Sequence, residues 1–413
     1  MKRLTGFAAT LALGAAAWLS AAHASDWPQF RGIRRDGVSA ETGLLHAWPE
    51  SGPREAWRRP VGPGYSGVSV VKGRLYTMFA EGDGDAAMEY AVALNPADGK
   101  EIWRTAVDKR YDTQFGNGPR ATPTVDGDSV YVLGSRGTLM ALSTADGSQR
   151  WKVQLTEAFG AKVPTWGFTV SAVVDGGKVI LEGGGPQGKS YAGIDAKSGQ
   201  VLWTFGDGPS EPGYMSPLAV DLEGRRQYVS VVGTTVRSVD GAGKMLWSYP
   251  WPEAETHATP VFVPPDRLFL SGVEGAGSVM LQVKNGKGEA AVTEVWKNPM
   301  FRTHFNAAVL QKDHLYGFDN TTLKCISVKD GSVAWVKRGL GKGSLIAADG
   351  LLMVLSDDGR LVLVEANPSQ YAEKGSIQAL KPEGGRAWTP PSLAEGRLYV
   401  RNHAELVAYI VKG

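Results

Sequence analysis

A short phrase that recurs along the chain constrains the fold more than any other feature. It consists of an apolar stretch, a turn that contains glycine, and a tryptophan four residues after that glycine. The copies occupy residues 93–103, 141–151, 193–203, 238–247 and 328–335. Seven tryptophans between Trp57 and Trp335 are spaced by about 46 residues on average. This period is typical of the blades of a β-propeller.

Each repeat unit contains the signals of several short strands. The central glycine supplies the positive φ angle that a tight hairpin turn requires. Upstream lies a β-rich run such as residues 129–133 or 397–400, which follows a second turn signal such as Asp126-Gly127. No comparable stretch has a sustained helical period. Each unit therefore predicts four short antiparallel strands.

The units can be counted into a closed ring. Six units end at a tryptophan between Trp103 and Trp335, and a seventh covers residues 344 to about 380 without one. Residues 388–410 have material for three strands, and residues 54–58 would supply the fourth. Stacked blades hide the faces that one blade cannot bury alone, whereas an open solenoid would leave two incomplete ends. We predict an all-β fold: an eight-bladed β-propeller of four-stranded antiparallel blades. It forms one domain, residues 25–413, closed by N- and C-terminal strands that share the last blade.

The first residues predict export. Lys2 and Arg3 precede an apolar stretch, and Ala22-His23-Ala24 provides small residues for cleavage. We expect residues 1–24 to be a Sec-type signal peptide, cleavage after Ala24, and a periplasmic or secreted protein. Removing Lys2 and Arg3 leaves 42 basic residues against 42 acidic ones, which disfavours nucleic-acid binding. We also expect no membrane span, no lipid anchor and a monomer.

The repeated phrase resembles the tryptophan-docking repeat of the PQQ-like (quinoprotein-type) β-propeller family. Residues 26–32 and 35–39 look like the opening of its secreted BamB-like group, and residues 118–124, 339–344 and 396–401 look like further parts of that pattern. The resemblance covers nearly all of the chain after residue 24. It implies the propeller fold, and it leaves the activity open because one fold carries many functions.

The resemblance also implies a test for enzymatic activity. Quinoprotein dehydrogenases of this family hold the quinone over the propeller axis with a calcium or lanthanide ion and an acidic base, many with a ring of two adjacent cysteines. This chain has one cysteine, Cys325, in an apolar run that predicts a buried strand residue. The family's metal-binding residues match no positions here, and no haem-attachment motif is present. We expect no cofactor and no catalytic residue, with PQQ and Ca²⁺ as the alternative.

A candidate binding site emerges when the first strands of the units are aligned on Pro123, Pro217, Pro260 and Pro391. In a propeller these strands line the axis, so the loops that lead into them converge on one mouth of the central channel. The loops would gather four aromatic side chains, two histidines and two cations, namely Tyr65, Arg120, Trp166, Tyr214, His257, His304, Lys342 and Trp388. Such a funnel suits a flat, anionic or sugar-like ligand, or a peptide of a partner.

Other interpretations of these residues remain open. The large side chains could only fill the axial hole, and His257 with His304 could share a metal ion or have structural roles. Gly183 to Gly185 with Lys189 lacks the spacing of a phosphate-binding loop and predicts a long turn in the third blade. The leading hypothesis is a non-catalytic BamB-like platform that binds an envelope protein or a small ligand. The alternatives are a periplasmic PQQ-dependent oxidoreductase acting on alcohols or sugars, and a carbohydrate-binding propeller.

Overall fold

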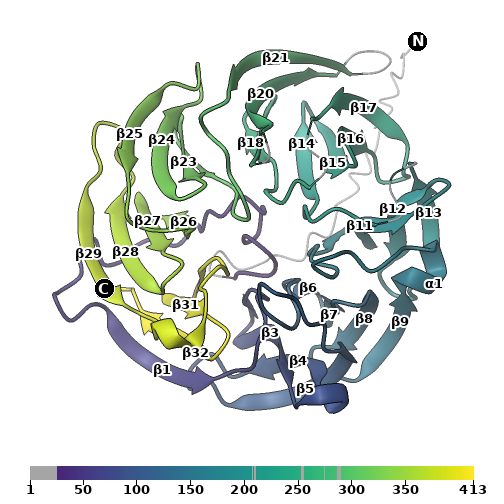
Figure 1. Ribbon diagram of the computed structural model, residues 1–413, viewed down its shortest axis with the longest axis horizontal. Coiled ribbons are helices and arrows are strands. Elements are labelled where there is room, and N and C mark those ends of the chain that lie inside the picture. The colour runs from purple at the N-terminus through teal and green to yellow at the C-terminus, as the bar shows by residue number, and fades with distance from the viewer. Residues whose placement is uncertain (1–25, 207, 209–210, 253–254, 274, 286–289) are drawn as a thin grey trace, which may run out of the picture.

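Eight four-stranded antiparallel sheets form a closed ring in the computed structural model (Figure 1). The structure describes residues 26–413 except 207, 209–210, 253–254, 274 and 286–289. The predicted eight-bladed propeller is confirmed, whereas the predicted signal peptide lies outside the described residues. In the part of the chain that is described, no helix is long and apolar enough to cross a membrane.

In the first four blades, each sheet follows the chain order from the axis outward. Blade 1 contains β2 (Ser69–Val71), β3 (Arg74–Glu81), β4 (Met88–Leu94) and β5 (Glu101–Lys109). Blade 2 contains β6 (Thr124–Asp126), β7 (Ser129–Leu133), β8 (Thr138–Ser143) and β9 (Gln149–Gln154). Blade 3 contains β10 (Val173–Asp175), β11 (Lys178–Gly185), β12 (Lys189–Asp195) and β13 (Val201–Phe205). Blade 4 contains β14 (Leu218–Leu222), β15 (Arg225–Val232), β16 (Thr235–Val239) and β17 (Met245–Pro250).

The second half of the ring repeats this order until the last blade. Blade 5 contains β18 (Val261–Val263), β19 (Arg267–Gly272), β20 (Gly277–Lys284) and β21 (Ala291–Asn298). Blade 6 contains β22 (Val309–Gln311), β23 (His314–Asp319), β24 (Thr322–Ser327) and β25 (Val333–Lys337). Blade 7 contains β26 (Ser344–Ala348), β27 (Leu351–Leu355), β28 (Arg360–Glu365) and β29 (Glu373–Gln378). Blade 8 contains β30 (Ser392–Ala394), β31 (Arg397–Arg401), β32 (Glu405–Ile410) and β1 (Arg54–Pro60). Short helices interrupt the pattern at α1 (Leu155–Phe159), η1 (Gly84–Ala86) and η2 (Pro382–Gly384).

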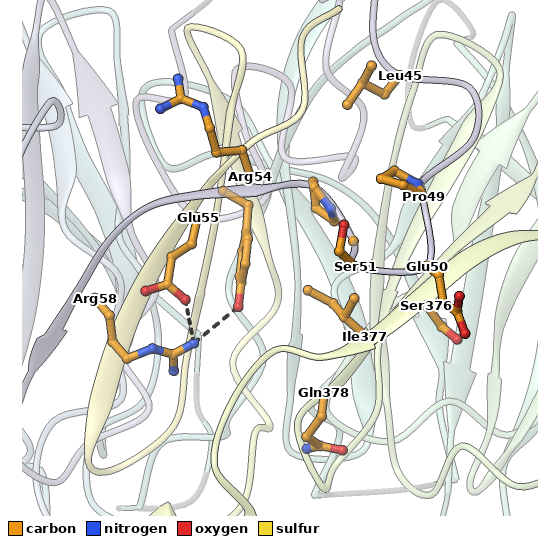
Figure 2. A pocket seen from close by; sticks show the side chains of 13 residues that line it. Leu45, Pro49, Glu50, Ser51, Arg54, Glu55, Arg58, Ser376, Ile377 and Gln378 are labelled. Carbon is orange, nitrogen blue, oxygen red and sulfur yellow. Dashed lines mark hydrogen bonds and ion pairs between the residues drawn. The ribbon is translucent and has the colours of Figure 1, made fainter.

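The two ends of the chain close the ring, as the sequence predicts. The N-terminal strand β1 pairs antiparallel with the C-terminal strand β32, from Arg54 opposite Ile410 to Pro60 opposite Glu405. Arg58 adds side-chain contacts: it forms ion pairs with Glu55 at 2.7 Å and with Glu405 at 2.8 Å. A groove of about 1060 Å³ lies beside this closure, between the chain around Pro49 and strand β29 (Figure 2).

Tryptophans at the blade ends pack between neighbouring blades. Trp151 in blade 2 donates a hydrogen bond of 2.9 Å from Nε1 to the carbonyl of Ala196, just after β12 in blade 3. Its ring lies against the turn at Gly199, which has a φ of 75° and whose added Cβ would come within 2.8 Å of the indole. Equivalent hydrogen bonds to backbone carbonyls of the next blade are donated by the indoles of Trp57, Trp103, Trp203, Trp296 and Trp335. Trp247 instead bonds Gln227 of its own blade.

Blade 7 has no terminal tryptophan, and a residue from outside the repeats takes the place. Gly375 pairs with Leu363 just before a β-bulge, as Trp151 pairs with Ala141 in blade 2. Trp48 covers this glycine. The backbone N–H of Trp48 donates to the carbonyl of Lys374 at 2.9 Å, and a Cβ added to Gly375 would lie 2.7 Å from the Cβ of Trp48. The segment before β1 thus completes the packing that the repeat lacks.

Residues 26–39, here called the axial segment, cross the centre of the ring (Figure 1). The segment is tied to blades on several sides of the channel. Its partners are the backbone groups of Val70, Val125, Ser171, Ala172, Ala307, Ala308 and Ala347. Two fully buried arginines, Arg31 and Arg35, make the contacts with blades 6 and 3. The axial segment therefore divides the central channel into two separate ends.

Candidate functional site

One cavity of about 370 Å³ opens at the end of the ring where the chain enters the innermost strands. All eight side chains of the predicted funnel line it, namely Tyr65, Arg120, Trp166, Tyr214, His257, His304, Lys342 and Trp388. Each comes from the loop that precedes an innermost strand, because that loop must turn from the rim towards the axis. The structure thus brings these residues together, and their role in binding stays a prediction.

Aromatic rings form a nearly continuous wall around this funnel. Trp388 stacks on Tyr65 with ring centroids 5.6 Å apart and an interplanar angle of 21°. On the other side, Phe305 lies 4.7 Å from Trp388. Tyr214 and His257 stack almost in parallel, 5.1 Å apart at 9°. Such faces offer flat apolar area to a planar group.

The sequence alignment does not identify nine further described residues that line the funnel, and four of them are Phe30, Phe115, Glu255 and Phe305. Phe30 comes from the axial segment and closes the bottom of the funnel, Phe115 comes from a long loop before Arg120, and Phe305 and Glu255 stand next to or near aligned histidines. Phe115 is half exposed, at 51%, and its ring lies 5.0 Å from that of Trp166. Phe305 was not predicted, although its position directly after the aligned His304 is a signal that could have identified it. Phe30 has no such signal, since it lies outside the repeats.

Two cations border the aromatic wall. The guanidinium of Arg120 lies 5.5 Å from the centre of the Tyr65 ring and also bonds Gly116, Gly118 and Thr113 of the loop that carries Phe115. Lys342 Nζ lies 5.5 Å from the centre of the Phe305 ring. Arg120 therefore organises one rim of the funnel, while both cations favour an anionic or electron-rich ligand.

The funnel histidines are uncharged at neutral pH. Burial lowers the pKa of His257 to about 4. Burial, together with His257 and Lys342, lowers the pKa of His304 to about 3. His304 Nδ1 accordingly accepts a hydrogen bond of 3.0 Å from Lys342 Nζ. His257 Nδ1 and Trp388 Nε1 are buried without a hydrogen-bond partner among the described residues, so both are suited to pair with a bound group.

The donor set does not fit a calcium-bound quinone. Calcium takes six to eight oxygen ligands, and among the described residues Glu255 and Asn306 are the lining side chains that carry a carboxylate or amide oxygen. Over the described ranges, no three His, Cys, Asp or Glu side chains lie together in a way that could hold a metal ion. Cys325 is fully buried on β24, and burial raises the pKa of its thiol to about 11, which confirms the predicted buried strand cysteine.

The glycines of blade 3 form no phosphate-binding loop. Gly183 to Gly185 end strand β11, Lys189 begins β12, and only residues 186–188 turn between them. The predicted long turn is wrong, because the glycines belong to strand β11: Gly185 pairs with Lys189 after a β-bulge at Gly183 and Gly184. Phe159 of α1 packs closely on Gly183 and Gly185.

A buried carboxyl supports the loop that carries Tyr214. Glu182 on β11 is 1% exposed, and a backbone hydrogen bond from Gly213 reaches it. Burial raises the pKa of Glu182 from an ordinary 4.5 to about 8. The folded protein thus keeps a proton that the unfolded chain releases, so this group lowers folding stability as pH rises from about 4.5 to about 8.

We expect Glu182→Gln to remove this pH dependence. The free energy of unfolding of the variant rises relative to that of the wild type between pH 5 and pH 9. The rise is roughly 1.4 kcal/mol for each unit by which folding raises the pKa of Glu182. Urea unfolding at both pH values measures this gain. The matched control is Glu157→Gln on α1, which is exposed and leaves the profile unchanged. A parallel loss or gain at both pH values would contradict a protonated Glu182.

Comparisons with known proteins agree with this architecture. A family model described as outer membrane protein assembly factor BamB matches residues 87–337. Over 133 residues the chain is 29% identical to the quinohemoprotein alcohol dehydrogenase ADH IIB of Pseudomonas putida, which covers 29% of the chain and 18% of that enzyme. Over 108 residues it is 32% identical to BamB of Escherichia coli K12, which covers 25% of the chain and 26% of BamB. The matches thus span about a fifth to a quarter of these relatives.

Solved structures share the fold at low sequence identity. The quinohemoprotein alcohol dehydrogenase from Comamonas testosteroni superposes with a TM-score of 0.65 at 14% identity, over 94% of this chain and 81% of that one. BamB from Moraxella catarrhalis superposes with a TM-score of 0.56 at 16% identity, over 85% and 97%. These likenesses show the fold alone. Because the family model covers more than half of the chain, the protein belongs to the PQQ-like propeller family described as outer membrane protein assembly factor BamB.

Proposed function

We propose that this protein is a non-catalytic binding platform of the cell envelope, BamB-like in kind, with the funnel as its binding element. Its place of action is the periplasm or the medium outside the cell. The funnel accepts a small ligand or a segment of an envelope protein. Family membership supports the binding role, because the matching family model carries the name of an assembly factor.

The observation that carries this proposal is that the described lining of the funnel is mainly aromatic and its two histidines are weak bases. Its wall consists of stacked aromatic rings, its floor is Phe30, and its cations lie at the side. The two wall histidines are neutral, and a histidine with a pKa of about 3 to 4 is a weak proton acceptor at pH 7. Such a site favours recognition over general acid–base or metal-assisted chemistry.

Two other functions compete for the same funnel. An oxidoreductase with PQQ and Ca²⁺ would need more calcium ligands than Glu255 and Asn306, the carboxylate and the amide among the described lining residues, provide. A carbohydrate-binding propeller would use the same aromatic faces, because sugar rings pack on aromatic planes. The second is the stronger competitor, and a panel of sugars separates it from a protein-binding role.

We expect Arg120→Ala combined with Trp388→Ala to weaken binding at the funnel by at least about thirtyfold, as loss of a buried aromatic anchor does. The wild type and the variant are titrated by thermal shift and calorimetry with mono- and oligosaccharides and with PQQ plus Ca²⁺. Pull-downs from periplasmic extract compare the same two proteins. The single variant Trp388→Ala removes part of the aromatic wall but keeps the hydrogen bonds of Arg120 to the loop. Comparison with the double variant therefore shows how much of the lost binding comes from loosening that loop.

The matched control is Arg150→Ala, which removes an ion pair on the outer strand β9 and leaves binding unchanged. Dye reduction over a panel of alcohols and sugars with PQQ and Ca²⁺ would contradict the non-catalytic proposal. Equal binding by the wild type and a folded double variant would show that the funnel side chains only fill the axial hole.

A further inference from the structure

One buried carboxyl, Glu89 of blade 1, lies where two loops of the funnel wall are joined. Glu89 is on β4 and is fully buried. Its carboxylate accepts a hydrogen bond of 2.8 Å from the backbone N–H of Ser135, in the turn between β7 and β8 of the neighbouring blade 2 (Figure 1). A longer bond of 3.4 Å comes from the backbone N–H of Tyr111, in the loop after β5 that carries Phe115. Glu89 therefore connects blade 1 to the turn of blade 2 and to this loop.

Ser135 links the Glu89 carboxylate to both loops. The hydroxyl of Ser135 donates to the carbonyl of Gly118 at 3.2 Å, near the end of the loop that carries Phe115. The carbonyl of Ser135 accepts a hydrogen bond of 2.9 Å from the backbone N–H of Phe168, two residues after Trp166. The position of Ser135 therefore affects the two aromatic rings of these loops, whose centroids lie 5.0 Å apart in the funnel.

Tyr111 makes a second connection between the same loops. Its backbone N–H faces Glu89, and its hydroxyl donates to the carbonyl of Pro164 at 3.1 Å, in the second loop. The two loops also pack closely at Gly167, where an added Cβ would come within 3.0 Å of Ser135 and 3.1 Å of the Tyr111 ring. The two loops, the turn of blade 2 and the Glu89 carboxylate thus form one packed unit.

The groups around Glu89 determine when it is charged. Asp108, its cross-strand partner on β5, brings a second carboxylate close to it, and Arg120 attracts it from the loop before β6. The guanidinium of Arg136 lies 5.4 Å from the centre of the Tyr111 ring. Burial raises the pKa of Glu89 to about 7, hydrogen bonds from the turn of blade 2 oppose this rise, and Asp108 adds to it. Glu89 therefore changes charge near neutral pH.

The histidines at the funnel do not change charge in this range. Burial lowers the pKa of His257 to about 4, and burial with the neighbouring positive charge lowers that of His304 to about 3. Burial also lowers the pKa of His403 to about 4. A response of the funnel loops between pH 6 and pH 8 therefore points to the buried carboxyls Glu89 and Glu182, and a variant of each separates the two.

We propose that Glu89 is a positioning residue that makes the funnel sensitive to pH: its ionised carboxylate holds the loops of Phe115 and Trp166 in place for binding, and its protonation loosens them. This inference rests on the proposed function of the funnel. When Glu89 is ionised, both of its oxygens accept N–H groups, whereas a protonated oxygen becomes a donor and weakens the bond from Ser135 or Tyr111. A ligand that contacts both loops therefore binds more tightly at pH 8 than at pH 6, and its binding releases a proton from Glu89.

The first test follows the loops without a ligand. The full chain after residue 24 is labelled with 5-fluorotryptophan, and Trp166→Phe assigns the Trp166 signal in fluorine NMR. We expect this signal to shift with a midpoint at about pH 7 in the wild type. Glu89→Gln keeps the signal at its low-pH position from pH 6 to pH 8, whereas Glu182→Gln and the control Asp85→Asn, an exposed carboxylate on η1, leave the titration unchanged. A Trp166 signal that is flat over this range in the wild type, or that titrates equally in Glu89→Gln, overturns the proposal.

The second test measures binding of the fluorescent aromatic anion 8-anilinonaphthalene-1-sulfonate, whose sulfonate is ionised at both pH values. We expect the wild type to bind it at least about threefold more tightly at pH 8 than at pH 6, and Glu89→Gln to remove this difference. An equal pH dependence in Glu89→Gln and the wild type would overturn the proposal. Equal binding by the wild type and the Arg120→Ala, Trp388→Ala variant would instead contradict the proposed function of the funnel, and the Trp166 titration then decides the role of Glu89.

Discussion

Trp151→Ala is expected to lower the free energy of unfolding by about 3–5 kcal/mol, the cost typical of truncating a buried tryptophan. Trp151 is 7% exposed, packs against Tyr131 at 5.9 Å between ring centroids, and bonds the carbonyl of Ala196 in the next blade. Its removal leaves a cavity between blades 2 and 3, while the Ala196 carbonyl keeps the hydrogen bond of 3.1 Å from the Tyr131 hydroxyl. Urea unfolding followed by circular dichroism measures the loss.

The control for this prediction is Ile102→Ala on β5, next to the equivalent tryptophan of blade 1. Ile102 is 45% exposed, so its truncation changes stability by less than about 0.5 kcal/mol. A loss below about 1 kcal/mol for Trp151→Ala would show that the indole does not join the blades.

Arg31→Ala is expected to cost about 3 kcal/mol or more, because Arg31 fastens the axial segment to blade 6. Its guanidinium donates to the carbonyls of Ala307 at 2.9 Å, Ala308 at 2.7 Å and Asp36 at 2.9 Å. Burial lowers the pKa of Arg31 to about 10, so the group stays charged at neutral pH. Each buried acceptor left without a donor costs about 1–3 kcal/mol. Urea unfolding measures the sum.

The axial segment offers its own control in Arg34→Ala. Arg34 is 66% exposed and forms an ion pair with Asp36 at 2.8 Å, and such surface pairs contribute below about 1 kcal/mol. Arg31→Lys keeps the charge but cannot reach three carbonyls with a planar fork, so an intermediate loss is expected. Equal losses for Arg31→Ala and Arg34→Ala would contradict the anchoring role.

Much of the fold follows from the sequence because its signals are local. A glycine with a φ of 74° at Gly147, an apolar run before it and Trp151 after it specify one hairpin and one packing contact. Their repetition specifies the number of blades and the closure by β1. The loops before the innermost strands followed from the same alignment, which explains why all eight aligned side chains line the funnel.

Other features have no repeated signal and could not be aligned. Trp48 fills the position opposite Gly375, although 327 residues separate the two along the chain. Phe30 forms the funnel floor, and Phe115 reaches the wall on a loop that Tyr65 and Arg120 hold. Each depends on the path of a non-repeating segment.

The sequence by itself determined the blade, the count of blades and the ring of loops at the funnel, because turns and strands depend on backbone preferences of neighbouring residues. Only the tertiary structure decided that the axial segment crosses the channel and forms the floor of the funnel with Phe30. The reason is that Arg31 and Arg35 are held by backbone carbonyls 276 and 136 residues away. Every residue has a backbone carbonyl, so a pattern of side chains does not reveal which carbonyls a buried arginine meets.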